Sequence, residues 1–222
     1  MKTIKGIIPP MITPLKGDDQ IDREGTVRLT EHILAGGVHA LFLLGTTGEA
    51  QSLSYECRYD FVELVCRQVA GRVPVLVGVT DTSLDESVKL AAHAAKCGAV
   101  AVVAAAPYYF APSQQELIEY YTALADALPL PLFLYNMPSH VKVFLEPATV
   151  KTLAEHPNIV GLKDSSANMT YFQTLLYHLG DREDFALYVG PEELTGESVV
   201  MGADGGVNGG ANIFPELYVQ MY

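Results

Sequence analysis

Short apolar runs alternate along the chain with longer amphipathic stretches. The runs are continuously apolar, which is typical of parallel strands buried on both faces of a sheet. Helical periodicity fills the stretches between them. The predicted strands are residues 7–12, 40–44, 73–79, 99–105, 132–135, 159–162, 186–189 and 205–207. The predicted helices are residues 23–35, 55–69, 83–96, 114–127, 147–155, 169–179, 194–201 and 215–222.

Eight strand–helix units in series favour a closed (β/α)8 barrel, the TIM-barrel class of α/β fold, over an open doubly wound sheet. No linker or low-complexity segment divides the chain, so we predict one domain over residues 1–222. A complete barrel typically needs about 250 residues. We therefore expect the domain to be truncated within its eighth helix.

Composition limits the function classes. Apolar residues make up 49% and charged residues 18%, as in globular proteins, and a net charge of −12 repels phosphate backbones. The longest apolar stretch, residues 99–107, is too short to cross a bilayer. We expect a cytoplasmic protein with no nucleic-acid or membrane partner. The chain has three cysteines, Cys57, Cys66 and Cys97, and such a sparse, odd number fits reduced thiols in the cytoplasm.

Candidate chemistry lies where the strands end, because barrel active sites are built at the carboxyl ends of the strands. Lys163 follows the predicted strand 159–162, where burial favours a neutral amine that can attack a ketone and form an iminium. Pairing with Asp164 in a structural role is the alternative. Tyr135 ends the neighbouring strand and could relay protons, or could be an ordinary aromatic lid.

Other strand ends carry weaker signals. Gly45-Thr46-Thr47-Gly48 offers N–H groups and hydroxyls for a carboxylate, although a plain turn with a helix N-cap and a structural Glu49 is the commoner meaning of such a segment. Glu192 and Glu193 are either an acidic pair at a helix start or ligands for substrate hydroxyls. Tyr109 is a solvent-facing aromatic or a dimer contact. No metal-ligand spacing, phosphate loop or dinucleotide fingerprint is present, so we predict neither metal nor cofactor.

Three of these segments together resemble the dihydrodipicolinate synthase and N-acetylneuraminate lyase family. They are Gly45-Thr46-Thr47-Gly48-Glu49, Tyr135-Asn136-Met137-Pro138 and Gly161-Leu162-Lys163-Asp164-Ser165, and they keep the family's order and separations. The similarity extends from about Lys5 to Tyr222. It implies a class I lyase or aldolase that forms a Schiff base with pyruvate or a 2-oxo acid. Such an enzyme makes or breaks the C–C bond between this 2-oxo acid and an aldehyde.

The resemblance also implies roles for single residues. Lys163 would form the iminium and Tyr135 would relay protons. Thr46 would link Tyr135 to Tyr109, the tyrosine that the family lends to a neighbouring subunit in a dimer of dimers. The substrate would be bound by Thr47 through its carboxylate and, elsewhere, by Val207, Gly190, Glu192, Glu193, Ser165 and His140. The resemblance further implies that the chain lacks helices that the family carries after the eighth strand.

Departures from the family pattern bear on the aldehyde. The synthases usually place an arginine at the position of His140, where it binds a second carboxylate. Gly209 stands where the neuraminate lyases tend to have a serine. We therefore expect a lyase for a 2-oxo acid sugar or a related substrate. The alternatives are 4-hydroxy-tetrahydrodipicolinate synthase and a barrel that binds a 2-oxo acid without turnover.

Overall fold

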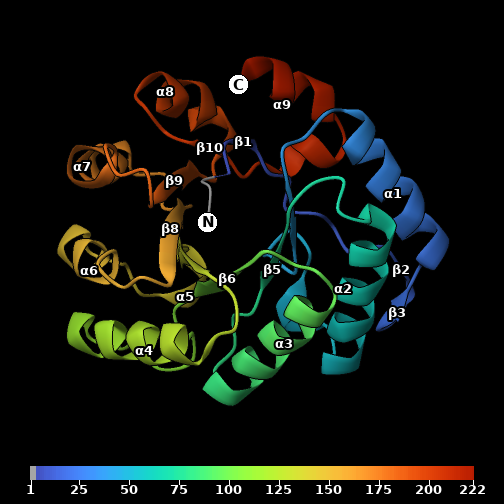
Figure 1. Ribbon diagram of the computed structural model, residues 1–222, viewed down its shortest axis with the longest axis horizontal. Coiled ribbons are helices and arrows are strands. Elements are labelled where there is room, and N and C mark those ends of the chain that lie inside the picture. Colours follow the sequence, from blue (N-terminus) through green and yellow to red (C-terminus); the bar gives the residue numbers. More distant parts are fainter. Residues whose placement is uncertain (1–3) are drawn as a thin grey trace.

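Eight parallel strands form one curled sheet at the centre of the molecule, and the helices surround it (Figure 1). The computed structural model describes residues 4–222, so the predicted domain boundary at residue 1 lies outside the described part. Around the sheet the strands follow the order β1 (Gly6–Ile7), β10 (Gly205–Gly206), β9 (Ala186–Val189), β8 (Ile159–Asp164), β7 (Leu132–Asn136), β6 (Ala101–Ala105), β5 (Val75–Gly78) and β4 (Leu41–Leu43).

The two ends of this sheet meet, which makes it a barrel. The Met11 N–H donates to the Phe42 carbonyl at 2.8 Å, and the Phe42 N–H donates to the Pro9 carbonyl at 3.0 Å. A parallel bridge also pairs Pro10 with Phe42. The (β/α)8 class expected from the order of elements is therefore the architecture of the described residues.

Helices cover the outside of the barrel. Each longer helix begins at a side-chain cap, because the first backbone N–H groups of a helix lack partners within it. Ser113 and Glu116, for example, form a reciprocal capping box at the start of α4. The helices are α1 (Arg23–Ala35), α2 (Tyr55–Val69), α3 (Leu84–Lys96), α4 (Gln114–Ala127), α6 (Pro147–Leu153), α7 (Met169–Leu179), α8 (Thr195–Val200) and α9 (Pro215–Met221).

Several boundaries differ from the sequence prediction. The strand predicted over 7–12 is limited to Gly6–Ile7, because Pro9 and Pro10 cannot donate to a ladder. β8 continues two residues beyond the predicted 159–162, so Lys163 lies within a strand instead of after it. The helix predicted over 147–155 ends at Leu153. The one predicted over 194–201 is split into η2 (Glu192–Leu194) and α8.

Five short elements were missed by the sequence prediction. A hairpin of β2 (Leu15–Gly17) and β3 (Gln20–Ile21) follows the first strand. A single helical turn, α5 (Pro138–Val141), carries His140 directly after β7. The 3-10 helix η1 (Ala50–Ser52) follows the Gly45–Gly48 loop, and η3 (Gly209–Asn212) follows β10. All are too short to produce a periodic apolar pattern.

The seam of the barrel is built from glycine. β1 and β10 pair over two residues only, Gly6 with Gly205 and Ile7 with Gly206. A Cβ on Gly205 would lie 1.9 Å from the Gly6 carbonyl oxygen, which is closer than any side chain can approach. The two strands therefore come together only because neither carries a side chain at that point.

A second glycine, Gly78 on β5, gives the basis for a stability prediction. A Cβ there would lie 2.2 Å from the carbonyl oxygen of Leu44, a buried residue with φ of 56°. Gly78→Ala must displace that backbone, and we expect a loss of about 1–3 kcal/mol in the free energy of unfolding. Urea unfolding would measure it. Gly196→Ala is the control, because nothing lies within 4 Å of its Cβ position. Equal unfolding midpoints for the two variants would contradict the prediction.

Candidate active site

Lys163 and Tyr135 lie side by side inside the barrel. They are direct partners in the register of β7 and β8, and each side chain is at least 90% buried. The Lys163 Nζ lies 4.4 Å from the centre of the Tyr135 ring and 5.4 Å from that of Phe42. Asp164 points to the opposite face of β8, where its carboxylate accepts hydrogen bonds from Asn136 and Ser166. The pairing of Lys163 with Asp164, left open by the sequence, is therefore not formed.

The surroundings of Tyr135 make its phenol easier to ionise. Burial opposes ionisation, but the charge of Lys163 and hydrogen bonds from Thr46, Ser165 and Lys163 outweigh it, so the pKa of Tyr135 lies below the usual tyrosine value. The Thr46 Oγ1 lies 3.3 Å from the phenol oxygen. A phenol that gives up its proton more readily is better suited to relay protons near neutral pH.

The loop after β4 holds the two threonines. Gly48 N–H donates to the Gly45 carbonyl at 3.1 Å, and Glu49 N–H donates to the Thr46 carbonyl at 3.0 Å, which folds the loop into a tight turn. Thr46 and Thr47 are both exposed at the barrel mouth. Glu49 has a left-handed φ of 54° and an exposed side chain. The turn thus presents both hydroxyls toward the carboxyl ends of the strands.

The predicted acidic residues lie on the other side of the mouth. Glu192 accepts a hydrogen bond from the Gly210 N–H at 2.5 Å and another from the Tyr218 hydroxyl. Burial and this bond raise the pKa of Tyr218 to about 12. Glu193 is exposed. Tyr218 was missed by the sequence analysis, because it lies on the last predicted helix and belongs to no motif.

Gly190 and Ser165 meet beside Tyr135 and Lys163. A Cβ on Gly190 would lie 2.1 Å from the Ser165 Oγ, so the glycine leaves the space that this hydroxyl occupies. Ser165 in turn helps to lower the pKa of Tyr135. Gly209 lies close to Thr47, whose Oγ1 would be 3.7 Å from a Cβ at that position.

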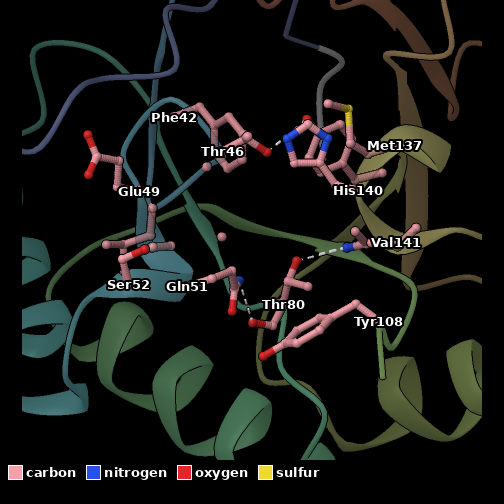
Figure 2. A pocket seen from close by; sticks show the side chains of 16 residues that line it. Phe42, Thr46, Glu49, Gln51, Ser52, Thr80, Tyr108, Met137, His140 and Val141 are labelled. Atoms are coloured by element: carbon pink, nitrogen blue, oxygen red, sulfur yellow. Dashed lines mark hydrogen bonds between the residues drawn. The ribbon is translucent and has the colours of Figure 1, made fainter. Parts of the chain in front are cut away.

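A cavity of about 350 Å³ opens above Tyr135 on the β4–β7 side of the barrel. Figure 2 shows Glu49 and Ser52 on one side of it and Met137 and His140 on the other. Tyr135 and Thr46 also line this cavity. Lys163 and Val207 border a separate small space of about 10 Å³ deeper in the barrel. Tyr135 both lines the larger cavity and contacts Lys163.

Tyr109 stands apart from these residues. Its side chain is 78% exposed and contacts Phe110, with ring centres 4.9 Å apart, whereas the neighbouring Tyr108 lines the cavity. Within the described chain, Tyr109 therefore contributes no wall to the cavity.

Residues 4–222 contain no cluster of three or more His, Cys, Asp or Glu side chains that could hold a metal ion. In the same part of the chain, no helix is long and apolar enough to cross a membrane.

Known proteins resemble this chain over almost its whole length. Residues 3–222 match the dihydrodipicolinate synthetase family. A 4-hydroxy-tetrahydrodipicolinate synthase from Hyphomonas neptunium is 40% identical over 98% of this chain and 74% of its own length. The putative 2-dehydro-3-deoxy-D-gluconate aldolase YagE from Escherichia coli is 34% identical over 97% of this chain and 72% of its own length.

The solved structures agree with the sequence matches. The dihydrodipicolinate synthase of Bacteroides thetaiotaomicron superposes with a TM-score of 0.95 at 60% identity, covering 99% of this chain and 74% of that one. YagE, solved in complex with pyruvate, superposes with a TM-score of 0.93. The resemblance inferred from the three motifs is thereby confirmed, and the chain belongs to the dihydrodipicolinate synthetase family.

Proposed function

We propose that the chain is a lyase or aldolase that forms a Schiff base between Lys163 and pyruvate or a related 2-oxo acid. The observation that carries this proposal is the buried contact between the Lys163 amine and the Tyr135 ring. The amine attacks the ketone carbon, and loss of water gives an iminium. The iminium accepts the electron pair of the bond that breaks, leaving an enamine, or the enamine attacks an aldehyde in the reverse direction.

The other candidate residues take supporting roles in this proposal. Tyr135, linked to Thr46, carries protons to and from the carbinolamine and the aldehyde oxygen. Thr47 and the backbone of Val207 hold the 2-oxo acid, with Ser165 and Gly190 shaping the space beside Tyr135. Tyr109, exposed and paired with Phe110, completes the site of a neighbouring copy in a dimer of dimers. We place the enzyme in the cytoplasm.

For the aldehyde, we favour an uncharged hydroxyaldehyde, which makes the combined substrate a 2-oxo acid sugar. Among residues 4–222, those lining the 350 Å³ cavity include no lysine or arginine, and Glu49 is the one acid among them. Such a cavity offers hydrogen bonds but no fixed cation for a second carboxylate. Glu193 is free to bind hydroxyls, whereas Glu192 would first have to release Tyr218. The alternative, 4-hydroxy-tetrahydrodipicolinate synthase activity, is favoured by the names of several relatives.

His140→Arg tests this choice. The arginine would add a fixed cation at the edge of the cavity, and a charge-assisted hydrogen bond contributes about 1.5–3 kcal/mol. We expect kcat/KM with aspartate semialdehyde to rise at least about tenfold relative to a hydroxyaldehyde such as glyceraldehyde. Steady-state kinetics on both aldehydes would measure the ratio. An unchanged ratio would show that His140 does not select the aldehyde.

The Schiff base itself is tested by incubating the protein with pyruvate and sodium borohydride, followed by intact mass measurement and peptide mapping. We expect one reduced pyruvate adduct per chain, on Lys163. A folded protein without adduct would refute the proposal. An adduct without turnover of any aldehyde would favour the remaining alternative, a barrel that binds a 2-oxo acid without catalysis.

A further inference from the structure

Two buried polar residues directly follow the catalytic pair. Asn136 comes after Tyr135, Asp164 comes after Lys163, and the two are partners in the register of β7 and β8. Because successive side chains of a strand point to opposite faces, this second pair faces the helices while the first faces the barrel interior. The Asn136 amide donates to Asp164 Oδ1 at 2.8 Å, and both side chains are at least 98% buried.

The pair is the centre of a larger hydrogen-bonded unit. The Asn136 Oδ1 accepts from the Leu145 N–H at 3.1 Å, which ties in the segment that follows α5. The Asp164 carboxylate accepts from the Ser166 N–H at 3.0 Å and from its hydroxyl at 2.9 Å. Burial raises the pKa of Asp164, and the bonds from Asn136 and Ser166 oppose that rise. A carboxylate held by three donors has little freedom to move.

The ladder between the same two strands is irregular at its other end. Leu132 pairs with Ile159, but Phe133 pairs with Gly161, so Val160 has no partner opposite it. A bulge of this kind re-aims the side chains beyond it, and a slip of one residue would turn each of them to the other face. The register that brings Tyr135 against Lys163 is thus set on the carboxyl-terminal side of the bulge.

We propose that the Asn136–Asp164 hydrogen bond is a positioning element that holds Tyr135 and Lys163 in register and at their working separation. The expected effect on reaction rate rests on the proposed function, whereas the expected effect on how Tyr135 and Lys163 lie does not. Asn136 and Asp164 touch no substrate in this proposal. They act through the two residues that precede them, by fixing how β7 and β8 lie against each other after the bulge.

Two variants separate positioning from charge. Asn136→Leu removes the hydrogen bond at nearly constant volume. Asp164→Asn removes the charge, but its amide oxygen can still accept from Asn136 and Ser166 N–H while its nitrogen donates to the Ser166 hydroxyl. Asn158→Leu is the matched control. That residue precedes β8 at the opposite end, where its amide donates to the carbonyls of Ala125 and Leu130.

The first readout needs no catalysis. Ultraviolet difference titration of each protein against its Tyr135→Phe counterpart reports the ionisation of Tyr135 alone. In Asn136→Leu we expect this phenol to titrate at a higher pH than in the wild type, because Lys163 no longer lies against it. In Asp164→Asn and Asn158→Leu we expect the wild-type midpoint. Circular dichroism confirms that each protein is folded.

The second readout is exchange of the pyruvate methyl protons with deuterium, followed by NMR without any aldehyde. Since a misplacement of about 1 Å can lower a rate about 100-fold, we expect Asn136→Leu to exchange 10- to 100-fold more slowly. Borohydride trapping on Lys163 should persist, and Asp164→Asn should restore the exchange rate to near wild type. If Asn136→Leu is insoluble, Asn136→Ser, too short to reach Asp164, replaces it.

Each result has one meaning. A wild-type Tyr135 titration and a wild-type exchange rate in folded Asn136→Leu would overturn the positioning role. If Asp164→Asn changed the titration and the exchange rate as much as Asn136→Leu does, the effect would be due to the charge of Asp164 instead. If Asn158→Leu showed the same changes as Asn136→Leu, the effect would be one of general destabilisation and not of positioning. A wild-type protein that neither exchanges nor traps pyruvate would refute the proposed function, and the titration alone would then decide the positioning role.

Discussion

Lys163→Ala should abolish the covalent pyruvate adduct completely. The alanine has no amine, so no iminium can form, and the electron sink on which bond cleavage depends is lost. Among the described residues, no other lysine lies over the Tyr135 and Phe42 rings, so we expect no neighbouring amine to replace Lys163. Intact mass measurement after borohydride reduction shows directly whether the mass of one reduced pyruvate adduct is present or absent.

Lys151→Ala is the control for this experiment, since Lys151 is exposed on α6 and outside the barrel interior. It should keep the full adduct. Circular dichroism of Lys163→Ala should match the wild type. An adduct that persists in Lys163→Ala, with peptide mapping to another residue, would show that Lys163 is not the nucleophile and would leave it as a buried structural lysine.

Tyr135→Phe should lower turnover by about 10²–10⁴-fold, the effect expected of a lost proton-transfer group. Pyruvate binding should change much less, because the phenyl ring keeps the packing against Lys163. The pKa of Tyr135 lies below the usual tyrosine value, so the phenolate is reached at a lower pH than in an exposed tyrosine. The wild-type rate should therefore follow an ionisation in that range, and Tyr135→Phe should lose that limb of its pH profile.

Rates and pyruvate dissociation constants measured on the same preparations separate binding from proton transfer. Thr46→Val offers a graded comparison, because it removes the 3.3 Å contact with the Tyr135 phenol but leaves the phenol in place. Its effect should be smaller than that of Tyr135→Phe. Near-wild-type turnover in Tyr135→Phe would exclude the tyrosine as the proton relay.

The barrel could be predicted from the sequence because its strands are continuous apolar runs and its helices have regular caps. The predicted ends of strands were wrong where the residues at the end fit both a strand and a loop. The sequence Ile159-Val160-Gly161-Leu162 contains no signal for the bulge at Val160. It also does not indicate that the strand continues through Lys163 and Asp164. The early prolines shortened the first strand, since a residue without an N–H can accept but not donate.

The site could be predicted in part. The adjacency of Tyr135 and Lys163 follows from two strand ends that are neighbours in the barrel, and the structure places them in register. The bond between Glu192 and Tyr218 could not be foreseen, because it joins the end of β9 to a helix 26 residues later in the chain. The separation of Lys163 and Val207 from the larger cavity likewise depends on how side chains fill the barrel.

The glycine seam between β1 and β10 belongs to the most weakly paired part of the barrel, together with the pairing of β10 with β9 and the bridge between Pro10 and Phe42. Two residue pairs hold it, whereas β7 and β8 are paired over five positions. Local opening of a protein starts where few hydrogen bonds and little apolar packing must be broken. Local opening of this barrel should therefore be more frequent at the seam than between β7 and β8. β7 and β8, which carry Tyr135 and Lys163, are not neighbours of this seam in the sheet. We therefore expect motion at the seam to change the distance between the Lys163 amine and the Tyr135 phenol only slightly.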